Sequence, residues 1–328
     1  MVGDGSESLD APDGESAGAK ISRGIVELDG RRLSYLSAGR PAGGPTMLLI
    51  HGSGVSARCW INQLRRLGDA LPVLAIDLPG HGESDPSEAA SVEEYARAVE
   101  GALDALGNGP VIAAGHSLGG AVAIALADRR PDAVRGLVLL ASCAKIPHTD
   151  SVGERILAAL PGPLRKIVFF SLAKKLLFAP GAPARAVSLS LQELRACRPE
   201  TILKDVRAAK AMDLTDRAAR LVVPTLILCG SRDKLTPPAL SERLSGLIAR
   251  SRLRIIEGAG HMLPLESPDR VNEEMLQFAF ALGVPAATVA AVEVPRARSL
   301  ARRVLDRAHG FGGRLLSALR IRRGEAKP

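Results

Sequence analysis

GHSLG, residues 115–119, is the stretch that decides the fold of this chain of 328 residues. An apolar run over residues 110–114 precedes it and is typical of a buried strand, and residues 120–130 follow with apolar side chains at helical spacing. A strand, a tight turn with serine at its apex and then a helix form the context in which G-x-S-x-G presents a nucleophile. The glycines leave room for chain and substrate, and the helix N-terminus favours the negative charge that forms when an ester carbonyl is attacked. The pattern therefore predicts that Ser117 is a nucleophile.

A serine hydroxyl needs a general base, and the base needs an orienting carboxylate. In this architecture the order along the chain is Ser, then Asp or Glu, then His. Three histidines follow Ser117: His148 lies in a proline-containing connection, His309 lies in a basic tail, and His261 lies in a glycine-rich turn after the strand-like residues 252–256. We therefore predict that His261 is the base.

The orienting acid is expected at the end of a strand between the nucleophile and the base. Residues 223–229 form such an apolar segment, and the turn GSRD that follows ends in Asp233. An aspartate in a turn is often there for the turn alone. Its place after the strand favours Asp233 as the carboxylate that orients His261.

An oxyanion hole is expected where HGSG, residues 51–54, follows the strand-like residues 46–50. Glycines on both sides of Ser53 let the backbone turn its N–H groups toward a substrate oxygen, so the N–H groups of Ser53 and Leu118 are the candidate donors. His51 and His81 are expected to hold their loops. The residues expected to line the substrate pocket are Gly52, Gly54, Trp60, Cys143, Phe169, Phe170 and Met262.

Five motifs together resemble the α/β-hydrolase family: HGSG at 51–54, DLPGHGES at 77–84, GHSLGG at 115–120, GSRD at 230–233 and GAGHM at 258–262. They occur in the family's order and approximate spacing, and the resemblance covers about residues 24–283. It implies an α/β fold with a mostly parallel eight-stranded sheet and helices on both faces. It also implies a triad of Ser117, Asp233 and His261 with no metal and no organic cofactor, most similar to bacterial serine esterases and lipases.

The chain divides into four parts by composition. Residues 1–20 are expected to be a disordered acidic leader without the features of a signal peptide, and residues 21–142 and 223–284 to form the core. Residues 143–222 have helical runs and no strand signal, which predicts a helical cap. The apolar run over 164–178 is either packing or an acyl-binding wall. Residues 285–328 form a basic, partly amphipathic tail.

The formal net charge of +8 comes from that tail, because residues 296–328 hold ten Lys and Arg against two Asp and Glu. The basic balance therefore does not indicate nucleic-acid binding at the site. Residues 296–323 are typical of a helix that lies on an anionic membrane, with a solvated tail or docking on the protein body as alternatives. Four cysteines without a C-x-x-C pair fit a reducing, cytoplasmic location, which leaves room for peripheral contact with the inner face of the membrane.

The sequence thus predicts a serine hydrolase that cleaves small-molecule carboxylic esters with an apolar acyl group through an acyl-enzyme intermediate. Two other enzymes on the same triad stay open: a carbon–carbon bond hydrolase of the aromatic-degradation type and an acyltransferase. A ligand receptor or scaffold without turnover is the alternative from a different class.

Overall fold

A computed structural model of the chain describes residues 18–40, 44–88, 90–147 and 162–284. The acidic leader, residues 148–161 of the predicted helical cap and the basic tail with its expected membrane contact lie outside these residues, apart from positions 18–20 of the leader. So do His148 and His309. What was predicted for these segments stays a prediction.

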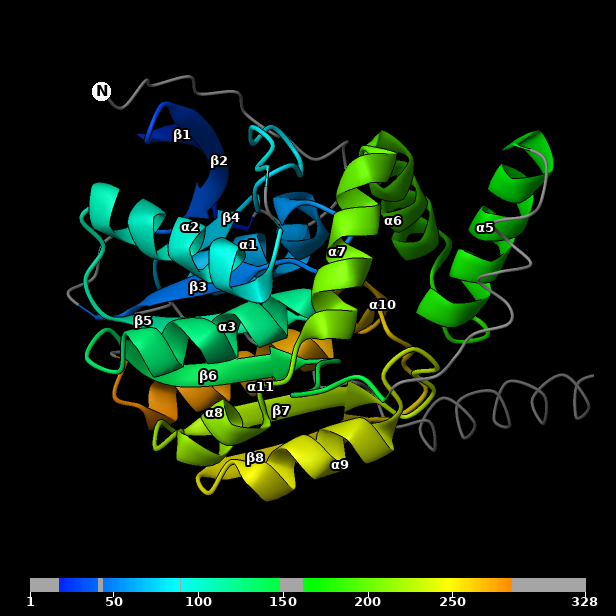
Figure 1. Ribbon diagram of the computed structural model, residues 1–328. Helices are drawn as coiled ribbons and strands as arrows, with labels where there is room; N and C mark the ends of the chain where they lie inside the picture. The colour runs from blue at the N-terminus through cyan, green and yellow to red at the C-terminus, as the bar shows by residue number, and fades with distance from the viewer. Residues whose placement is uncertain (1–17, 41–43, 89, 148–161, 285–328) are drawn as a thin grey trace, which may run out of the picture. The chain divides into compact units, whose positions relative to one another are not determined.

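Eight strands form a single sheet in the order β1-β2-β4-β3-β5-β6-β7-β8 (Figure 1). β2 pairs antiparallel with β1 and with β4, and the other pairs are parallel. The turn between β1 and β2 places Asp29 and Gly30 at positive φ, as a two-residue hairpin loop requires. The strands are β1 (Ile21–Leu28), β2 (Arg31–Ala38), β3 (Thr46–Ile50), β4 (Val73–Ile76), β5 (Val111–His116), β6 (Val134–Leu140), β7 (Thr225–Gly230) and β8 (Ser251–Ile256).

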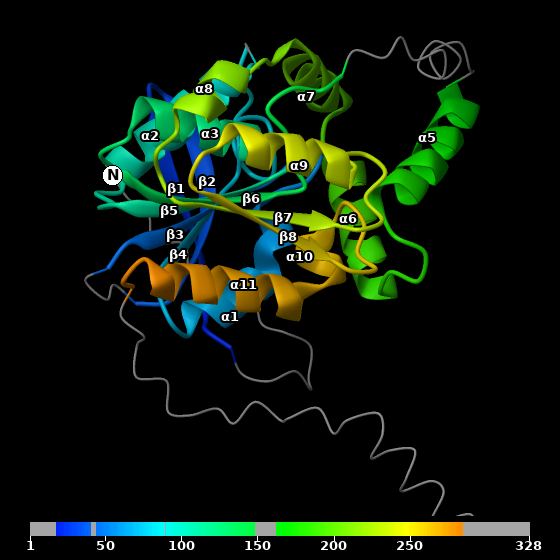
Figure 2. The same ribbon diagram turned by 90° about the horizontal axis from the view of Figure 1, so that it is seen from below.

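Helices cover both faces of this sheet (Figure 2), which confirms the expected α/β fold with a mostly parallel sheet. One face carries α2 (Val92–Ala105), α3 (Leu118–Arg129), α8 (Thr215–Arg220) and α9 (Pro238–Leu247). The other carries the 3-10 turn η1 (Ala57–Trp60), α1 (Ile61–Gly68), α10 (Leu263–Glu266) and α11 (Pro268–Ala281). None of the described helices combines the length and the apolar composition that crossing a bilayer requires.

Three further helices lie in the chain between β6 and β7, and we call them the insertion helices. They are α5 (Gly162–Leu177), α6 (Ala184–Ala196) and α7 (Pro199–Ala211). Two backbone contacts join the ends of the segment that contains them: Lys145 pairs with Asp213, and Leu214 N donates to Ala144 O at 2.8 Å. α8 was not expected from the sequence and packs on α3 and α9 rather than on the insertion helices.

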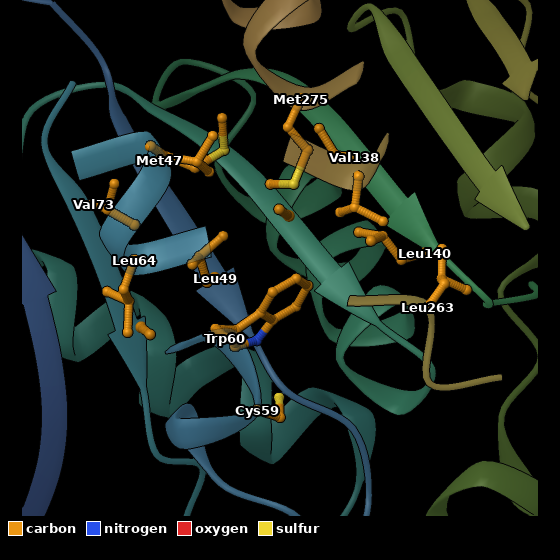
Figure 3. Close-up of a cluster of buried hydrophobic side chains, with 14 of the residues drawn as sticks. Met47, Leu49, Cys59, Trp60, Leu64, Val73, Val138, Leu140, Leu263 and Met275 are labelled. Atoms are coloured by element: carbon orange, nitrogen blue, oxygen red, sulfur yellow. The ribbon is translucent and has the colours of Figure 1, made fainter. Parts of the chain in front are cut away.

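The core consists of two apolar layers, one on each face of the sheet. Successive residues of β3 alternate between them: Met47 and Leu49 belong to the layer under α1 and α11, and Leu48 and Ile50 to the layer under α2 and α3. Figure 3 shows the first layer, in which the Trp60 ring lies among aliphatic side chains. Because both faces are covered, the central strands read as continuous apolar runs in the sequence.

Candidate active site

Ser117 stands in a strained turn between β5 and α3. Its backbone has φ 53° and ψ −118°, a conformation that side-chain-bearing residues rarely adopt. The end of β6 holds the turn, because Ser117 N donates to Leu140 O at 2.9 Å and the Ser142 hydroxyl donates to Ser117 O at 2.9 Å. The strain is therefore maintained by contacts on both sides of the serine, and the side chain is presented at the end of the strand.

The flanking glycines are required by close backbone approach. A Cβ at Gly115 would lie 2.1 Å from Gly119 O, and one at Gly119 would lie 2.2 Å from Ile50 O. Neither distance is compatible with a side chain, so the glycines of the motif allow α3 to start directly against β3 and β5.

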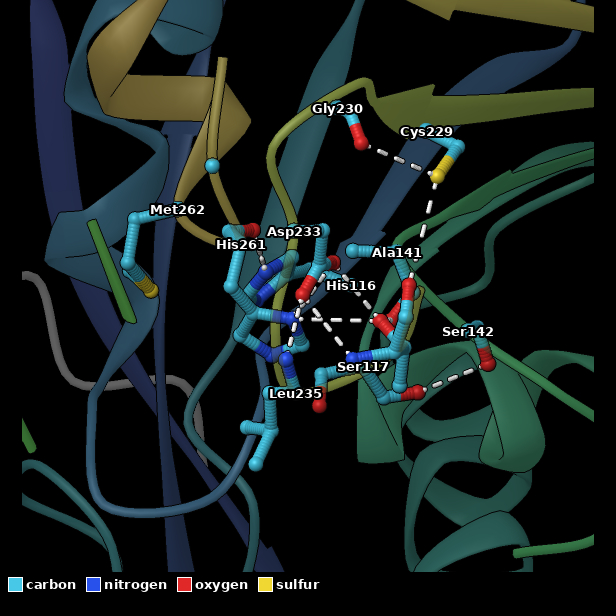
Figure 4. Close-up of polar contacts among 12 residues, drawn as sticks. His116, Ser117, Ala141, Ser142, Cys229, Gly230, Asp233, Leu235, His261 and Met262 are labelled. Atoms are coloured by element: carbon cyan, nitrogen blue, oxygen red, sulfur yellow. Dashed lines mark hydrogen bonds and ion pairs between the residues drawn. The ribbon is translucent and has the colours of Figure 1, made fainter. Parts of the chain in front are cut away.

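His261 and Asp233 form a buried pair beside this turn (Figure 4). His261 Nδ1 lies 2.9 Å from Asp233 Oδ2. The carboxylate also accepts the N–H groups of Leu235 at 2.8 Å and Thr236 at 2.9 Å. Burial works against its ionisation, but the hydrogen bonds from His261 and Thr236 hold the pKa of Asp233 below its ordinary value. An ionised Asp233 fixes the proton on Nδ1 and leaves Nε2 of His261 free to act as a base.

The topology explains why these residues meet. Ser117, Asp233 and His261 each follow the carboxyl end of a parallel strand, β5, β7 and β8 respectively. The carboxyl ends of parallel strands share one edge of a sheet, which is where α/β proteins place their sites.

The loop that carries His261 is held by partners that sequence reasoning missed. Leu177 O, at the end of α5, accepts from His261 N at 3.0 Å and from Met262 N at 3.1 Å. The Glu266 carboxylate accepts from the N–H groups of Ala179, Gly260 and Met262 at 3.0–3.1 Å. Burial raises the pKa of Glu266, and these N–H groups counteract the shift. The sequence gives no local signal for these contacts, because α10 is a single short turn.

His116, the residue before Ser117, bonds the loop that carries His261. Burial lowers the pKa of its imidazole to about 3, so the ring is neutral. Its Nε2 lies 2.9 Å from His261 O, and a carbonyl there requires the proton on Nε2.

The HGSG loop runs next to Ser117. A Cβ at Gly52 would lie 3.1 Å from Ser117 Cβ, so the loop passes close beside the serine. His51 holds it: Nδ1 donates to Gly52 O at 2.8 Å, and Nε2 accepts from Leu78 N at 2.9 Å. Burial, with the nearby His81, lowers the pKa of His51 to about 3 and keeps this tautomer neutral.

The second candidate donor lies at the start of α3. Leu118 is the first residue of the helix, where an N–H has no acceptor within the helix. The N–H groups of Leu118, which follows Ser117, and of Ser53, which follows Gly52 in the loop beside Ser117, therefore stay the candidate oxyanion donors.

Comparison with known proteins agrees with the fold. A family model described as "Alpha/beta hydrolase family" matches residues 47–274. The chain belongs to the alpha/beta hydrolase family. It is 33% identical over 222 residues to a pimeloyl-[acyl-carrier protein] methyl ester esterase of Neisseria meningitidis, a match that covers 65% of this chain and 85% of that protein. It is also 29% identical to the dihydrolipoyllysine-residue acetyltransferase component of an acetoin cleaving system of Pseudomonas putida, over 77% of this chain and 68% of that protein.

Among solved structures, a thermophilic esterase superposes with a TM-score of 0.70 at 32% identity and covers 81% of this chain and 100% of its own. This alpha/beta hydrolase is therefore similar both to esterases and to an acyl-transferring component. Within the described residues, no group of three or more His, Cys, Asp and Glu side chains is placed to hold a metal ion.

Four of the residues expected to line the pocket of this alpha/beta hydrolase lie near the segments of Ser117, Asp233 and His261. Gly52 and Gly54 lie in the loop beside Ser117, and Met262 and Cys143 are buried next to the His261 and Asp233 segments. Burial raises the pKa of the Cys143 thiol to about 11, so it is protonated at neutral pH.

The three aromatic residues expected in the pocket lie on η1 and α5. Trp60 is fully buried in the core layer of Figure 3, so its ring forms core rather than pocket surface. The ring of Phe170, on α5, lies 5.2 Å from the Arg195 guanidinium carbon of α6. Phe169 is also in α5, and its side chain lies outside the described part of the chain.

Proposed function

We propose that the protein is a serine hydrolase that cleaves carboxylic esters with an apolar acyl group through an acyl-enzyme intermediate. The observation that carries this proposal is the strained turn of Ser117 beside the buried 2.9 Å pair of His261 and Asp233. Ser117 Oγ attacks the ester carbonyl while His261 Nε2 accepts its proton. Asp233 stabilises the imidazolium, and the N–H groups of Ser53 and Leu118 stabilise the oxyanion. The proton then passes to the leaving alcohol, and water repeats the cycle to release the acid.

The choice of an apolar acyl group is supported by the side chains around the HGSG loop. A Cβ at Gly54 would lie 2.7 Å from Leu194 Cδ1 and 3.8 Å from Ile202 Cγ1, so aliphatic side chains of α6 and α7 lie against this loop. We therefore propose that the insertion helices act as the cap of the site and present an apolar surface to the acyl chain. The similarity to a methyl ester esterase is in keeping with ester hydrolysis.

Hydrolysis of p-nitrophenyl esters from acetate to palmitate tests the proposal. We expect Ser117→Ala to lower kcat at least about 10³-fold, because removing a nucleophile disables the triad as a unit. Ser171→Ala, which changes an exposed serine of α5, is the matched control and should keep wild-type rates. The chain length with the highest kcat/KM then defines the acyl specificity.

Failure of ester turnover would be read with a fluorophosphonate probe. If the probe labels Ser117 but no ester is cleaved, the nucleophile stands and ester hydrolysis is rejected in favour of carbon–carbon bond hydrolysis or acyl transfer. If Ser117 is neither labelled nor active, the enzyme assignment on this triad is wrong.

A further inference from the structure

A buried carboxylate outside the triad joins α7 to the candidate oxyanion loop. Asp205 has a fully buried side chain. Its Oδ2 accepts from the Ser53 hydroxyl at 2.7 Å and lies 2.9 Å from His81 Nε2, and its Oδ1 accepts from the Tyr95 hydroxyl at 2.6 Å. One side chain of the insertion helices thus gathers partners from three separate segments of the core.

The hydrogen bonds from these partners stabilise the buried negative charge of Asp205. Burial opposes ionisation, but the hydrogen bonds from His81, Tyr95 and Ser53 hold the pKa of Asp205 below its ordinary value. The second ring nitrogen of His81 lies 3.3 Å from Pro79 O, so both ring nitrogens face oxygen acceptors. A buried carboxylate is costly unless it is fully hydrogen-bonded, which means that the partners must keep their positions while α7 is docked.

The loop between Asp205 and the nucleophile has little room to move. On one side, a Cβ at Gly52 would lie 3.1 Å from Ser117 Cβ. On the other side, Gly54 has φ +71° and faces Leu194 of α6. Ser53 lies between these two glycines, and its hydroxyl is fixed by Asp205. The direction of the Ser53 N–H therefore depends on the insertion helices.

We propose that Asp205 is a positioning residue that completes the oxyanion hole. This inference rests on the proposed use of the Ser53 N–H as an oxyanion donor. Asp205 of α7 binds the Ser53 hydroxyl and thereby holds the Ser53 N–H toward the reacting carbonyl. The hole is then complete when α7 is docked and incomplete when it is not. The residue touches no substrate and acts through Ser53.

Two hydroxyl deletions provide a matched test. Ser53→Ala and Tyr95→Phe each remove one hydrogen bond to Asp205. The backbone N–H of residue 53 is retained in Ser53→Ala, so only its positioning is changed. We expect Ser53→Ala to lower kcat for a p-nitrophenyl ester about 10- to 100-fold with KM changed less than about 2-fold, as for a misdirected oxyanion donor. Tyr95→Phe should change kcat less than about 3-fold although both variants lower the Tm.

A double-mutant cycle separates positioning from general destabilisation. Asp205→Asn should reproduce the kcat loss of Ser53→Ala, and combining the two should add little, because both break the same contact. Combining Ser53→Ala with Tyr95→Phe should leave the kcat of Ser53→Ala unchanged. Equal kcat losses for Ser53→Ala and Tyr95→Phe, or losses for Ser53→Ala and Asp205→Asn that multiply, would overturn the proposal.

The rate at which a fluorophosphonate labels Ser117 keeps this test separate from the proposed ester hydrolysis. The phosphoryl oxygen of the probe occupies the place of the oxyanion, so slower labelling of Ser53→Ala and Asp205→Asn, but not of Tyr95→Phe, supports the inference even if no ester is cleaved. Equal labelling rates in all variants with normal ester turnover reject the inference and leave the hydrolase assignment. A wild-type protein without labelling and without turnover rejects both.

Discussion

The two halves of the insertion are attached to the core in different ways. α6 and α7 are bound through polar side chains: Glu193 accepts a hydrogen bond from Ser56, and Arg198 donates to the carbonyl oxygens of Gly80 at 3.1 Å and Ser84 at 3.3 Å. The body of α5 packs on α6 and leaves Leu172 45% exposed, and α5 bonds the core at its C-terminal end, where Leu177 O accepts from the His261 and Met262 N–H groups. In Figure 1 this helix lies farther from the sheet than α6 and α7.

The difference indicates that α6 and α7 position the loops beside Ser117, whereas α5 covers α6. Polar contacts with fixed geometry specify one arrangement, and α6 and α7 direct them at the loops beside Ser117. An aliphatic surface such as that of α5 tolerates sequence change, because apolar contacts are not directional. We therefore expect the polar contacts of α6 and α7 to control the rate of catalysis. We expect the exposed side chains of α5 to contribute little to stability.

The largest effect is expected from Leu194→Ala on α6. The side chain is 9% exposed and lies against Gly54 of the HGSG loop. Its truncation leaves a cavity and should lower the free energy of unfolding by about 2 to 3 kcal/mol. Urea denaturation followed by circular dichroism measures the change. A loss below about 0.5 kcal/mol would show that α6 is no better packed than an exposed helix.

A pH-dependent effect is expected for the contact of α7. Because the pKa of Asp205 in the folded protein lies below its ordinary value, its ionised form stabilises the fold. That contribution is complete above about pH 5 and is lost as the pH falls through the folded pKa. The stability gap between wild type and Asp205→Asn should therefore narrow as the pH falls from about 5 to about 3, as measured by thermal unfolding. The shift at Asp233 is common to both proteins and cancels. A gap that does not vary with pH would contradict the charged state of Asp205.

The smallest effect is expected from Leu172→Ala, the matched change on α5. The side chain is 45% exposed, so truncation removes little buried surface. We expect the free energy of unfolding to change by less than about 0.5 kcal/mol in the same urea experiment. A loss as large as that of Leu194→Ala would remove the distinction between the two halves.

The sequence was most informative where chemistry depends on a local turn. The glycines of GHSLG are needed because the backbones of β5, α3 and β3 touch, and such a requirement is visible in the letters themselves. Asp233 and His261 each follow an apolar strand segment, so their meeting follows from the parallel sheet. The fold and the family were therefore within reach, whereas the roles of the triad await the experiments above.

What the sequence did not reveal depends on contacts between distant segments. Asp205 and Ser53 are 152 residues apart, and no spacing rule relates them. A weak signal was present: Thr201, Asp205 and Ala208 share the buried face of α7, so a charged residue stands where an apolar one is expected. Trp60 illustrates the converse, because an aromatic residue after the oxyanion loop faces either the pocket or the core, and here it faces the core.

The backbone contact between α5 and the histidine loop has a mechanical consequence. Leu177 O accepts from both His261 N and Met262 N, and Ala179 N shares the Glu266 carboxylate with Gly260 N and Met262 N. Any outward swing of the chain after α5 breaks these bonds and releases the segment that aims the imidazole. In the proposed mechanism, a conformation that lacks these bonds would also lack a fixed general base, so access to the site and catalytic competence are coupled.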